Sequence, residues 1–244
     1  MKNRHVFLKQ TLNIKWMFII ASCFLSPVIF AQVSLPKLGT SKVIGKVDGI
    51  KIEAKVQSPS GQQTPLQIVC LFEYTDGDIF NPPALPKDLN GMVHVDEAMH
   101  GLITAIRKDG KFSGYRYETL LIDPPTNTIP AKKLLLVGLG DRNDFKADIM
   151  ETVGRIGMRE ALRMGVTSYS HASDLKDAGI SSPTSAVAAL VVKGALDAYR
   201  TQTYLKKKGA ARFLPIAKFT LLTGPAFFED SQKGVMPILQ TFNN

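Results

Sequence analysis

The residues that most suggest a binding site in this sequence are Gly138, Gly140 and Asn143, which follow an apolar run. A strand that leads through a glycine turn into a helix opens many nucleotide sites, because glycine lets the backbone approach a phosphate. A dinucleotide fingerprint needs a third glycine where Asn143 stands, and Asp141 adds negative charge beside it. We therefore expect a glycine turn required by the fold, with Asn143 capping the next helix. Anion binding at Gly138, Gly140 and Asn143 stays open as the alternative.

A second candidate set is His94, Glu97 and His100, which recur at every third residue of a segment expected to be helical. Side chains at that spacing spread over about 120° of a helix surface, which is awkward for a single metal ion. His171 lies far along the chain, and neither a His-Glu-x-x-His nor a Gly-x-Ser-x-Gly motif is present. We expect no catalytic residue, no metal site and no cofactor.

The elements that position these residues are predicted from hydrophobic periodicity and turn residues. Asp48-Gly49 stands between two alternating segments and predicts a β-hairpin. Strands then alternate with long helices, which predicts an α/β fold: a three-layer sandwich with a mixed, mostly parallel sheet between helices. We expect strands at 66–74, 118–125, 132–140, 165–171 and 217–224, and helices at 95–110, 144–164, 182–205 and 225–242, the last interrupted near Gly234 and Pro237.

Residues 1–31 have the pattern of a secretory signal peptide. Their charged residues are all basic, an apolar run spans 16–30, and Ile29 and Ala31 precede a plausible cleavage site. We expect cleavage before Gln32 and a secreted, periplasmic protein whose residues 32–244 form a single domain. A retained membrane anchor and a lipid on Cys23 are the alternatives.

The remaining charge and cysteine content suggest an ordinary globular domain. The formal net charge is +9, and part of this excess lies in the predicted signal. The densest basic run, 206–208, follows a predicted helix and is expected to be solvated, so neither a nucleic-acid partner nor a stable membrane anchor is expected. Cys70 lies in a continuous apolar run, where a buried and unreactive thiol is expected.

Several segments together resemble the N-terminal domain of the leucyl aminopeptidase family. The stretch "LLLVGLGDRNDFKADIMETVGRIGMREAL" is similar to that domain's strand, Gly-Leu-Gly turn and helix. The stretch "AVAALVVKGALDAYRTQTYLKKK" is similar to its next helix, in which Gly194, Tyr199 and Arg200 match a Gly-Ala-Leu-x-x-Tyr-Arg pattern. The resemblance covers roughly residues 45–240 and implies a macro-domain-like fold.

The same resemblance implies a role without catalysis. In the family, the metal ligands belong to a separate catalytic domain marked by Asn-Thr-Asp-Ala-Glu-Gly-Arg, and this sequence has no such stretch. The first hypothesis is a secreted, non-catalytic domain for binding, assembly or regulation, with a protein, a small ligand or a second copy as its partner. The alternatives are a nucleotide- or anion-binding macro-like module and an accessory subunit of a separately encoded metallo-aminopeptidase.

Overall fold

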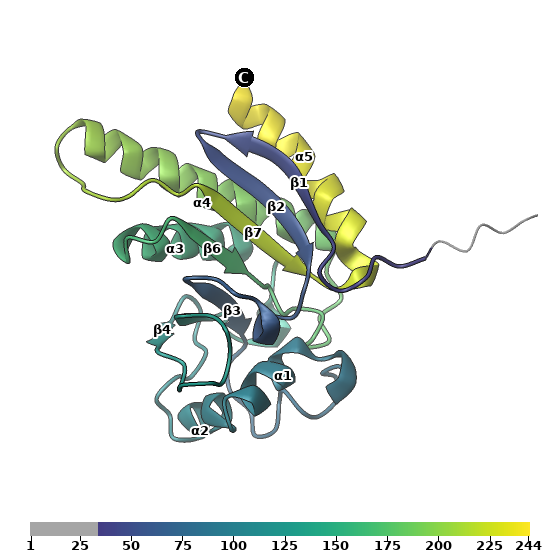
Figure 1. The fold of residues 1–244 in the computed structure, drawn as a ribbon. Helices are drawn as coiled ribbons and strands as arrows, with labels where there is room; N and C mark the ends of the chain where they lie inside the picture. The colour runs from purple at the N-terminus through teal and green to yellow at the C-terminus, as the bar shows by residue number, and fades with distance from the viewer. Residues whose placement is uncertain (1–33) are drawn as a thin grey trace, which may run out of the picture. The chain divides into compact units, whose positions relative to one another are not determined.

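A computed structural model of the chain describes residues 34–244, and Leu35–Asn244 form one compact unit (Figure 1). The predicted signal peptide and Cys23 lie outside the described residues. The strands are β1 (Ser41–Val47), β2 (Ile50–Val56), β3 (Gln67–Leu71), β4 (Thr119–Ile122), β5 (Leu134–Gly138), β6 (Ser168–His171) and β7 (Lys218–Thr223). The helices are α1 (Gly91–Ala98), α2 (Leu102–Lys108), α3 (Ile149–Arg163), α4 (Thr184–Lys207) and α5 (Phe228–Asn243).

The seven strands form one mixed sheet in the order β1-β2-β7-β6-β3-β5-β4. β1 is antiparallel to β2 and β4 is antiparallel to β5, whereas every other pairing is parallel. The predicted hairpin is confirmed: Asp48 and Gly49 connect β1 to β2 with φ angles of 50° and 88°. Two positive φ angles are the requirement of the tight turns that match strand twist. The predicted fold class is therefore confirmed.

Helices cover both faces of the sheet, and the side chains of β3 show how the core divides. Ile68 and Cys70 pack into the cluster that α3, α4 and α5 cover, whereas Val69 and Leu71 pack against α1 and α2. This alternation follows from the two-residue period of a strand. Cys70 is a free, buried cysteine, and its burial raises the pKa of the thiol well above the usual value. The expectation of a buried thiol is confirmed.

The predicted helix 95–110 is wrong in its extent, because two short helices occupy this region. α1 begins earlier, at Gly91, where the side chain of Asn90 accepts hydrogen bonds from the next helical amides. It ends where His100 and Gly101 adopt φ angles of 58° and 79°. The buried Asp96 then caps α2 by accepting from the N–H and the hydroxyl of Thr104 at 3.0 and 2.6 Å. Gly101 and Asp96 thus separate α1 from α2, whereas hydrophobic periodicity alone predicts one continuous helix.

The interruption predicted near Gly234 and Pro237 is also wrong, because α5 continues through both residues. Pro237 lies on the exposed side of the helix, so water can satisfy the carbonyl that loses its amide partner. The buried side of the helix, including Val235 and Leu239, packs into the core and keeps the helix in place. Among residues 34–244, no helix has both the length and the apolar character to cross a membrane.

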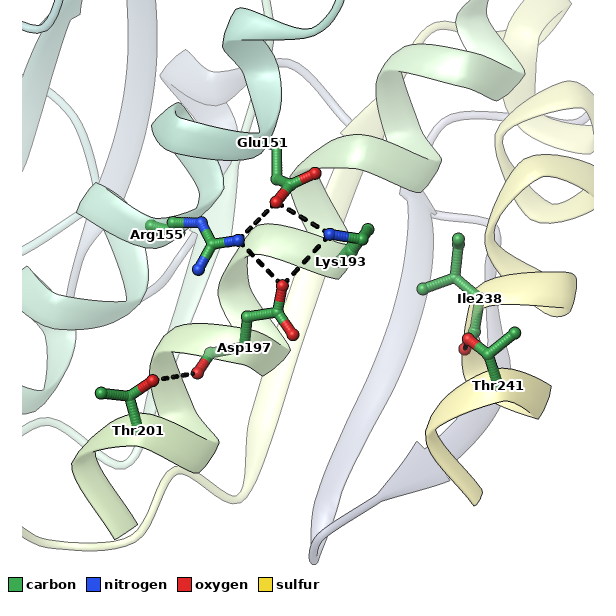
Figure 2. Close-up of polar contacts among 7 residues, drawn as sticks. All are labelled: Glu151, Arg155, Lys193, Asp197, Thr201, Ile238 and Thr241. Atoms are coloured by element: carbon green, nitrogen blue, oxygen red, sulfur yellow. Dashed lines mark hydrogen bonds and ion pairs between the residues drawn. The ribbon is translucent and has the colours of Figure 1, made fainter. Parts of the chain in front are cut away.

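α3 and α4 lie close together because glycines face backbone at their contact. A Cβ atom on Gly194 would lie 1.8 Å from the carbonyl oxygen of Glu151, and one on Gly154 would lie 2.1 Å from that of Val191. On the more exposed side of this contact, four charged side chains join the helices (Figure 2). This ionic cluster consists of Glu151, Arg155, Lys193 and Asp197.

The ionic cluster neutralises its own charge. Lys193 Nζ lies 2.8 Å from Glu151 and 3.2 Å from Asp197, and Arg155 contacts both carboxylates. Hydrogen bonds from Lys193 and Arg155 lower the pKa of Glu151, and the bond to Glu151 raises the pKa of Lys193. With two cations and two anions already paired, the cluster is best explained as a connection between helices.

Candidate functional site: a cleft at the carboxyl ends of the parallel strands

A cleft with a volume of about 620 Å³ opens where β2, β7 and β6 end. These three strands are parallel, so their carboxyl ends meet at one edge of the sheet. From β3 the chain continues toward β4 and β5, whereas from β6 it continues to β7 on the other side. Ligands of open α/β sheets bind at such reversals, and small-molecule sites measure roughly 300–1,000 Å³. The reversal lies between β3 and β6, and the cleft begins on its β6 side, so its place and its size mark it as a candidate site.

Apolar side chains form most of the cleft wall, as is typical of small-molecule sites. They come from the segment before β1, the end of β2, the loop before α1, the first turns of α4 and the end of β7. Two of them, Leu38 and Leu89, are 72% and 64% exposed, so apolar surface remains available at the rim. The larger apolar residues of the wall are Leu35, Leu38, Val56, Leu85, Leu89, Leu175, Val187, Val191, Leu221, Leu222 and Phe227.

His171, the last residue of β6, supplies a buried polar group to the cleft. Its side chain is almost fully buried, and its Nε2 atom has no hydrogen-bond partner within residues 34–244. Desolvation lowers the pKa of His171 to about 4, so the imidazole is neutral at physiological pH. A buried polar atom without a partner costs about 1–3 kcal/mol, and such an atom beside a cleft is a candidate for ligand contact.

Two carboxyl groups, Asp174 and Asp177, follow in the loop after β6 and line the same cleft. Protein atoms surround both on most sides, although each keeps contact with solvent through the cleft. Burial, and then the charge of Asp177, raise the pKa of Asp174 well above the usual range. Burial raises the pKa of Asp177 to about 6, against the opposing effect of the Gly91 and Met92 amides and of His94.

The hydrogen bonds of the predicted anion site show what its glycines do. The amide of Gly138 donates to the carbonyl of Glu118 at 2.8 Å, and the amide of Gly140 donates to that of Gly114 at 3.0 Å. A Cβ on Gly138 would lie 2.0 Å from the carbonyl oxygen of Tyr115, and Gly140 has a φ angle of 80°. Both glycines are thus required by the fold, and both amides are already engaged. Anion binding at this turn stays a prediction.

Asn143 lies beside a smaller cavity of about 210 Å³, which Asp174 and Asp177 also line. The expectation that Asn143 caps the following helix is wrong. Both its backbone and side-chain nitrogens donate to Asp141, at 2.8 and 3.0 Å, and α3 begins further on, at Ile149. Asp141 is the capping residue of a single short turn here, because its carboxylate accepts the first free amide.

The three residues considered for a metal site have separate roles in the structure. His94 lines the cleft, Glu97 pairs with Lys87 at 2.6 Å on the surface, and His100 lies just beyond the end of α1. The fold brings His94 to the same cleft as His171, which the sequence places far away. Among residues 34–244, no group of three or more histidine, cysteine, aspartate or glutamate side chains is arranged to hold a metal ion.

Sequence reasoning did not single out Asp174 and Asp177, although a signal for them exists. They closely follow the predicted strand 165–171, and polar residues just beyond a parallel strand are well placed to reach a ligand. The sequence predicts the strand, but it does not predict that the strand lies between β3 and β7 in the sheet. Because the place of this strand in the sheet is not known from the sequence, nothing there distinguishes the loop after His171 from an ordinary polar connection.

The fold and the order of the motifs define the class of protein. Residues 79–208 match the family model of the cytosol aminopeptidase family, N-terminal domain, and the chain belongs to this family. A probable cytosol aminopeptidase of Thermosynechococcus vestitus is 37% identical over 70 residues. That alignment spans 27% of this chain and only 14% of the cyanobacterial protein, so the two share a limited segment.

Solved structures support the same fold. A tomato leucine aminopeptidase mutant aligns over 86% of this chain and 38% of its own, with a TM-score of 0.56 and 16% identity. The Oceanobacillus iheyensis macrodomain with MES bound aligns over 83% of this chain and 98% of its own, with a TM-score of 0.55 and 11% identity. A Trypanosoma brucei macrodomain in complex with ADP gives a TM-score of 0.52 at 13% identity, covering 82% of this chain and 78% of its own. These similarities establish a macro-domain-like fold.

Proposed function

We propose that this chain is an exported, non-catalytic binding domain of the cytosol aminopeptidase family and that the cleft is its ligand site. The observation that carries the proposal is the mainly apolar cleft of about 620 Å³ at the carboxyl ends of β2, β7 and β6. Apolar walls give affinity, and a few polar groups, here His171, Asp174 and Asp177, give orientation. Export is proposed from the basic and apolar pattern of residues 1–31.

The ligand site is tested with a neutral fluorescent probe, N-phenyl-1-naphthylamine, whose emission rises in apolar surroundings. We expect saturable binding of one probe per chain. Ala226→Trp should weaken it on the order of tenfold, because Ala226 is an exposed residue of the cleft wall and the larger side chain would occupy ligand space. Fluorescence titration of the two proteins checks this.

Ala210→Trp is the matched control for the titration. Ala210 is also exposed, but it follows α4 and does not line the cleft, so this variant should bind the probe as the original chain does. Equal weakening in both variants would point to a general effect of the added tryptophan. Undiminished binding in Ala226→Trp would place the probe elsewhere and reject the cleft.

The exported and non-catalytic parts of the proposal are tested on the chain purified from the periplasm. Its intact mass should correspond to a first residue at Gln32, because Ala31 ends the predicted signal. The same sample should release no chromophore from a leucyl anilide with Mn²⁺ or Zn²⁺ added. A retained Met1 would contradict export with cleavage. Metal-dependent release that follows the protein through two columns, and is missing from a mock preparation, would contradict the non-catalytic role.

A further inference from the structure

The charges around the cleft are unbalanced toward the acidic side. Asp88, Asp174 and Asp177 line it, whereas Lys176 is its one lysine or arginine among residues 34–244. The ammonium group of Lys176 is already engaged: it donates to the carbonyl oxygen of Ser182 at 2.6 Å and lies 5.6 Å from the centre of the Phe227 ring. The inner carboxyl groups are therefore not paired with a lysine or arginine of the cleft.

The positions of the two inner carboxyl groups are fixed by the sheet and by α1. An oxygen of Asp174 accepts the N–H of Cys70 in β3 at 3.1 Å. The backbone carbonyl of Asp177 accepts from the side chain of Asn90, the residue that caps α1, at 3.3 Å. Its carboxyl group accepts from the amides of Gly91 and Met92 at the start of α1. None of the ion pairs within residues 34–244 includes either aspartate. Both carboxyl groups are thus held in place outside the ion pairs of the described residues, and His94 is the basic side chain whose charge acts on Asp177.

His171 is an independent sign of a ligand at the same place. It is nine-tenths buried or more, lines the cleft, and its Nε2 atom has no partner in the part of the chain that the structure describes. A neutral imidazole has one acceptor nitrogen and does not repel a cation. Because the ring is held neutral by burial, a positively charged ligand can lie beside it without like-charge repulsion.

We infer that the cleft binds a small ligand with an apolar body and one ammonium group, which is seated at Asp174 and Asp177. This inference rests on the proposed function and adds the class of ligand. An ammonium group donates three hydrogen bonds and has no acceptor, so it matches carboxylate oxygens and an imidazole nitrogen. A phosphate or carboxylate at the same place would meet like charge. The apolar wall, including Val187 and Leu221, would receive the body of the ligand.

The test uses three probes with the same six-carbon chain: n-hexylamine, 1-hexanol and hexanoate. Each competes with the neutral fluorescent probe on the mature chain at about pH 8, where Asp177 is ionised. Hexylamine should compete at concentrations on the order of tenfold below those of hexanol, because it alone brings a positive charge to the carboxylate. Hexanoate should compete least. In Asp177→Asn, the preference for the amine over the alcohol should largely disappear.

The amine preference should also fall when the pH is lowered to about 5. Hexylamine stays cationic there, whereas Asp177, with a pKa of about 6, becomes mostly neutral. His171 remains neutral through most of this range, since its pKa is about 4. The titratable and charged groups that line the two cavities beside Asp177 are Cys70, Glu73, Tyr74, Asp78, Asp88, His94, Asp141, Arg142, His171, Asp174 and Lys176.

The Asp177→Asn variant should fold normally, so lost selectivity would not reflect unfolding. In the original chain, the raised pKa of Asp177 means that the native state binds the proton of this carboxyl group more tightly than the unfolded chain does. The associated stability is full below the ordinary aspartate pKa and is lost as the pH rises through about 6. At about pH 8, replacement by the neutral amide therefore should not destabilise the fold. Asp230→Asn, an exposed change with the same loss of charge, should keep the amine preference.

The outcomes separate the ligand class from the site itself. Equal competition by all three probes, or a preference for hexanoate, would overturn the ammonium inference while leaving the cleft as a binding site. An amine preference unchanged in both Asp177→Asn and Asp174→Asn would also overturn it. If neither the fluorescent probe nor any six-carbon compound binds, the proposed function fails together with the inference.

Discussion

Arg107→Ala is expected to lower the free energy of unfolding by about 3–5 kcal/mol, because it breaks a buried ion pair and leaves one partner behind. The guanidinium of Arg107 is 2% exposed and donates to both oxygens of Asp78, at 2.9 and 2.7 Å. It also donates to the carbonyl of Phe72 at 2.9 Å. The substitution would therefore leave a mostly buried carboxylate and a carbonyl without their donor. Denaturant unfolding, followed by circular dichroism, measures the loss.

The matched control is Lys108→Ala on the same helix. Lys108 lies 3.9 Å from Asp76, and both side chains are mostly exposed, so the change should cost less than about 1 kcal/mol. Arg107→Lys should fall between the two, because one ammonium group cannot replace a fork that contacts two side-chain oxygens and a carbonyl. If Arg107→Ala stays as stable as Lys108→Ala, the buried pair is not needed for the fold.

The ion pair also bears on the candidate site, because it holds the segment between β3 and α1. Asp78 lies in this segment, and its bond to Arg107 ties the segment to α2. The segment ends at Asn90, which caps α1 and thereby positions His94 at the cleft. From the sequence alone, Arg107 is only one of the basic residues near the end of a predicted helix. Its role depends on Asp78, which is distant in sequence and lies between the predicted strand 66–74 and the predicted helix 95–110.

Local structure was predicted well where the residues of one short segment determine its conformation by themselves. The Asp48-Gly49 turn is such a case, because both residues tolerate the positive φ angles that the turn requires. The apolar runs of β3 and β5 are buried on both faces, as parallel strands between helical layers are. Alternating strands and helices then sufficed to predict the class of fold.

The site was harder to predict because it depends on which strand ends meet. His94 belongs to α1, and His171 ends β6, and only the strand order places both at one cleft. The glycine turn drew attention for its residue types, whereas its amides are used by the fold. Hydrophobic periodicity likewise could not show that packing carries α5 through Pro237. These features are set by tertiary contacts that a single sequence does not display.

The second large effect is expected for Gly194→Ala, which should destabilise the protein by about 2–3 kcal/mol. In an isolated helix the same change would stabilise by about 1 kcal/mol, because alanine has the higher helix propensity. Here the added Cβ would lie 1.8 Å from the carbonyl oxygen of Glu151, so α3 and α4 would have to move apart. The sign of the effect therefore distinguishes close helix packing from propensity. Denaturant unfolding of the purified variant measures it.

Gly61→Ala provides the control, because it adds the same methyl group where there is room. The nearest atoms to a Cβ at this position would belong to the flexible side chain of Gln57, at 3.4 Å or more. We expect a change within about 0.5 kcal/mol. Gly154→Ala, whose Cβ would meet the carbonyl oxygen of Val191 at 2.1 Å, should behave like Gly194→Ala. A neutral or stabilising Gly194→Ala would mean that the two helices can separate at little cost. Close helix packing would then not explain why Gly194 matches the glycine of the family's Gly-Ala-Leu-x-x-Tyr-Arg pattern.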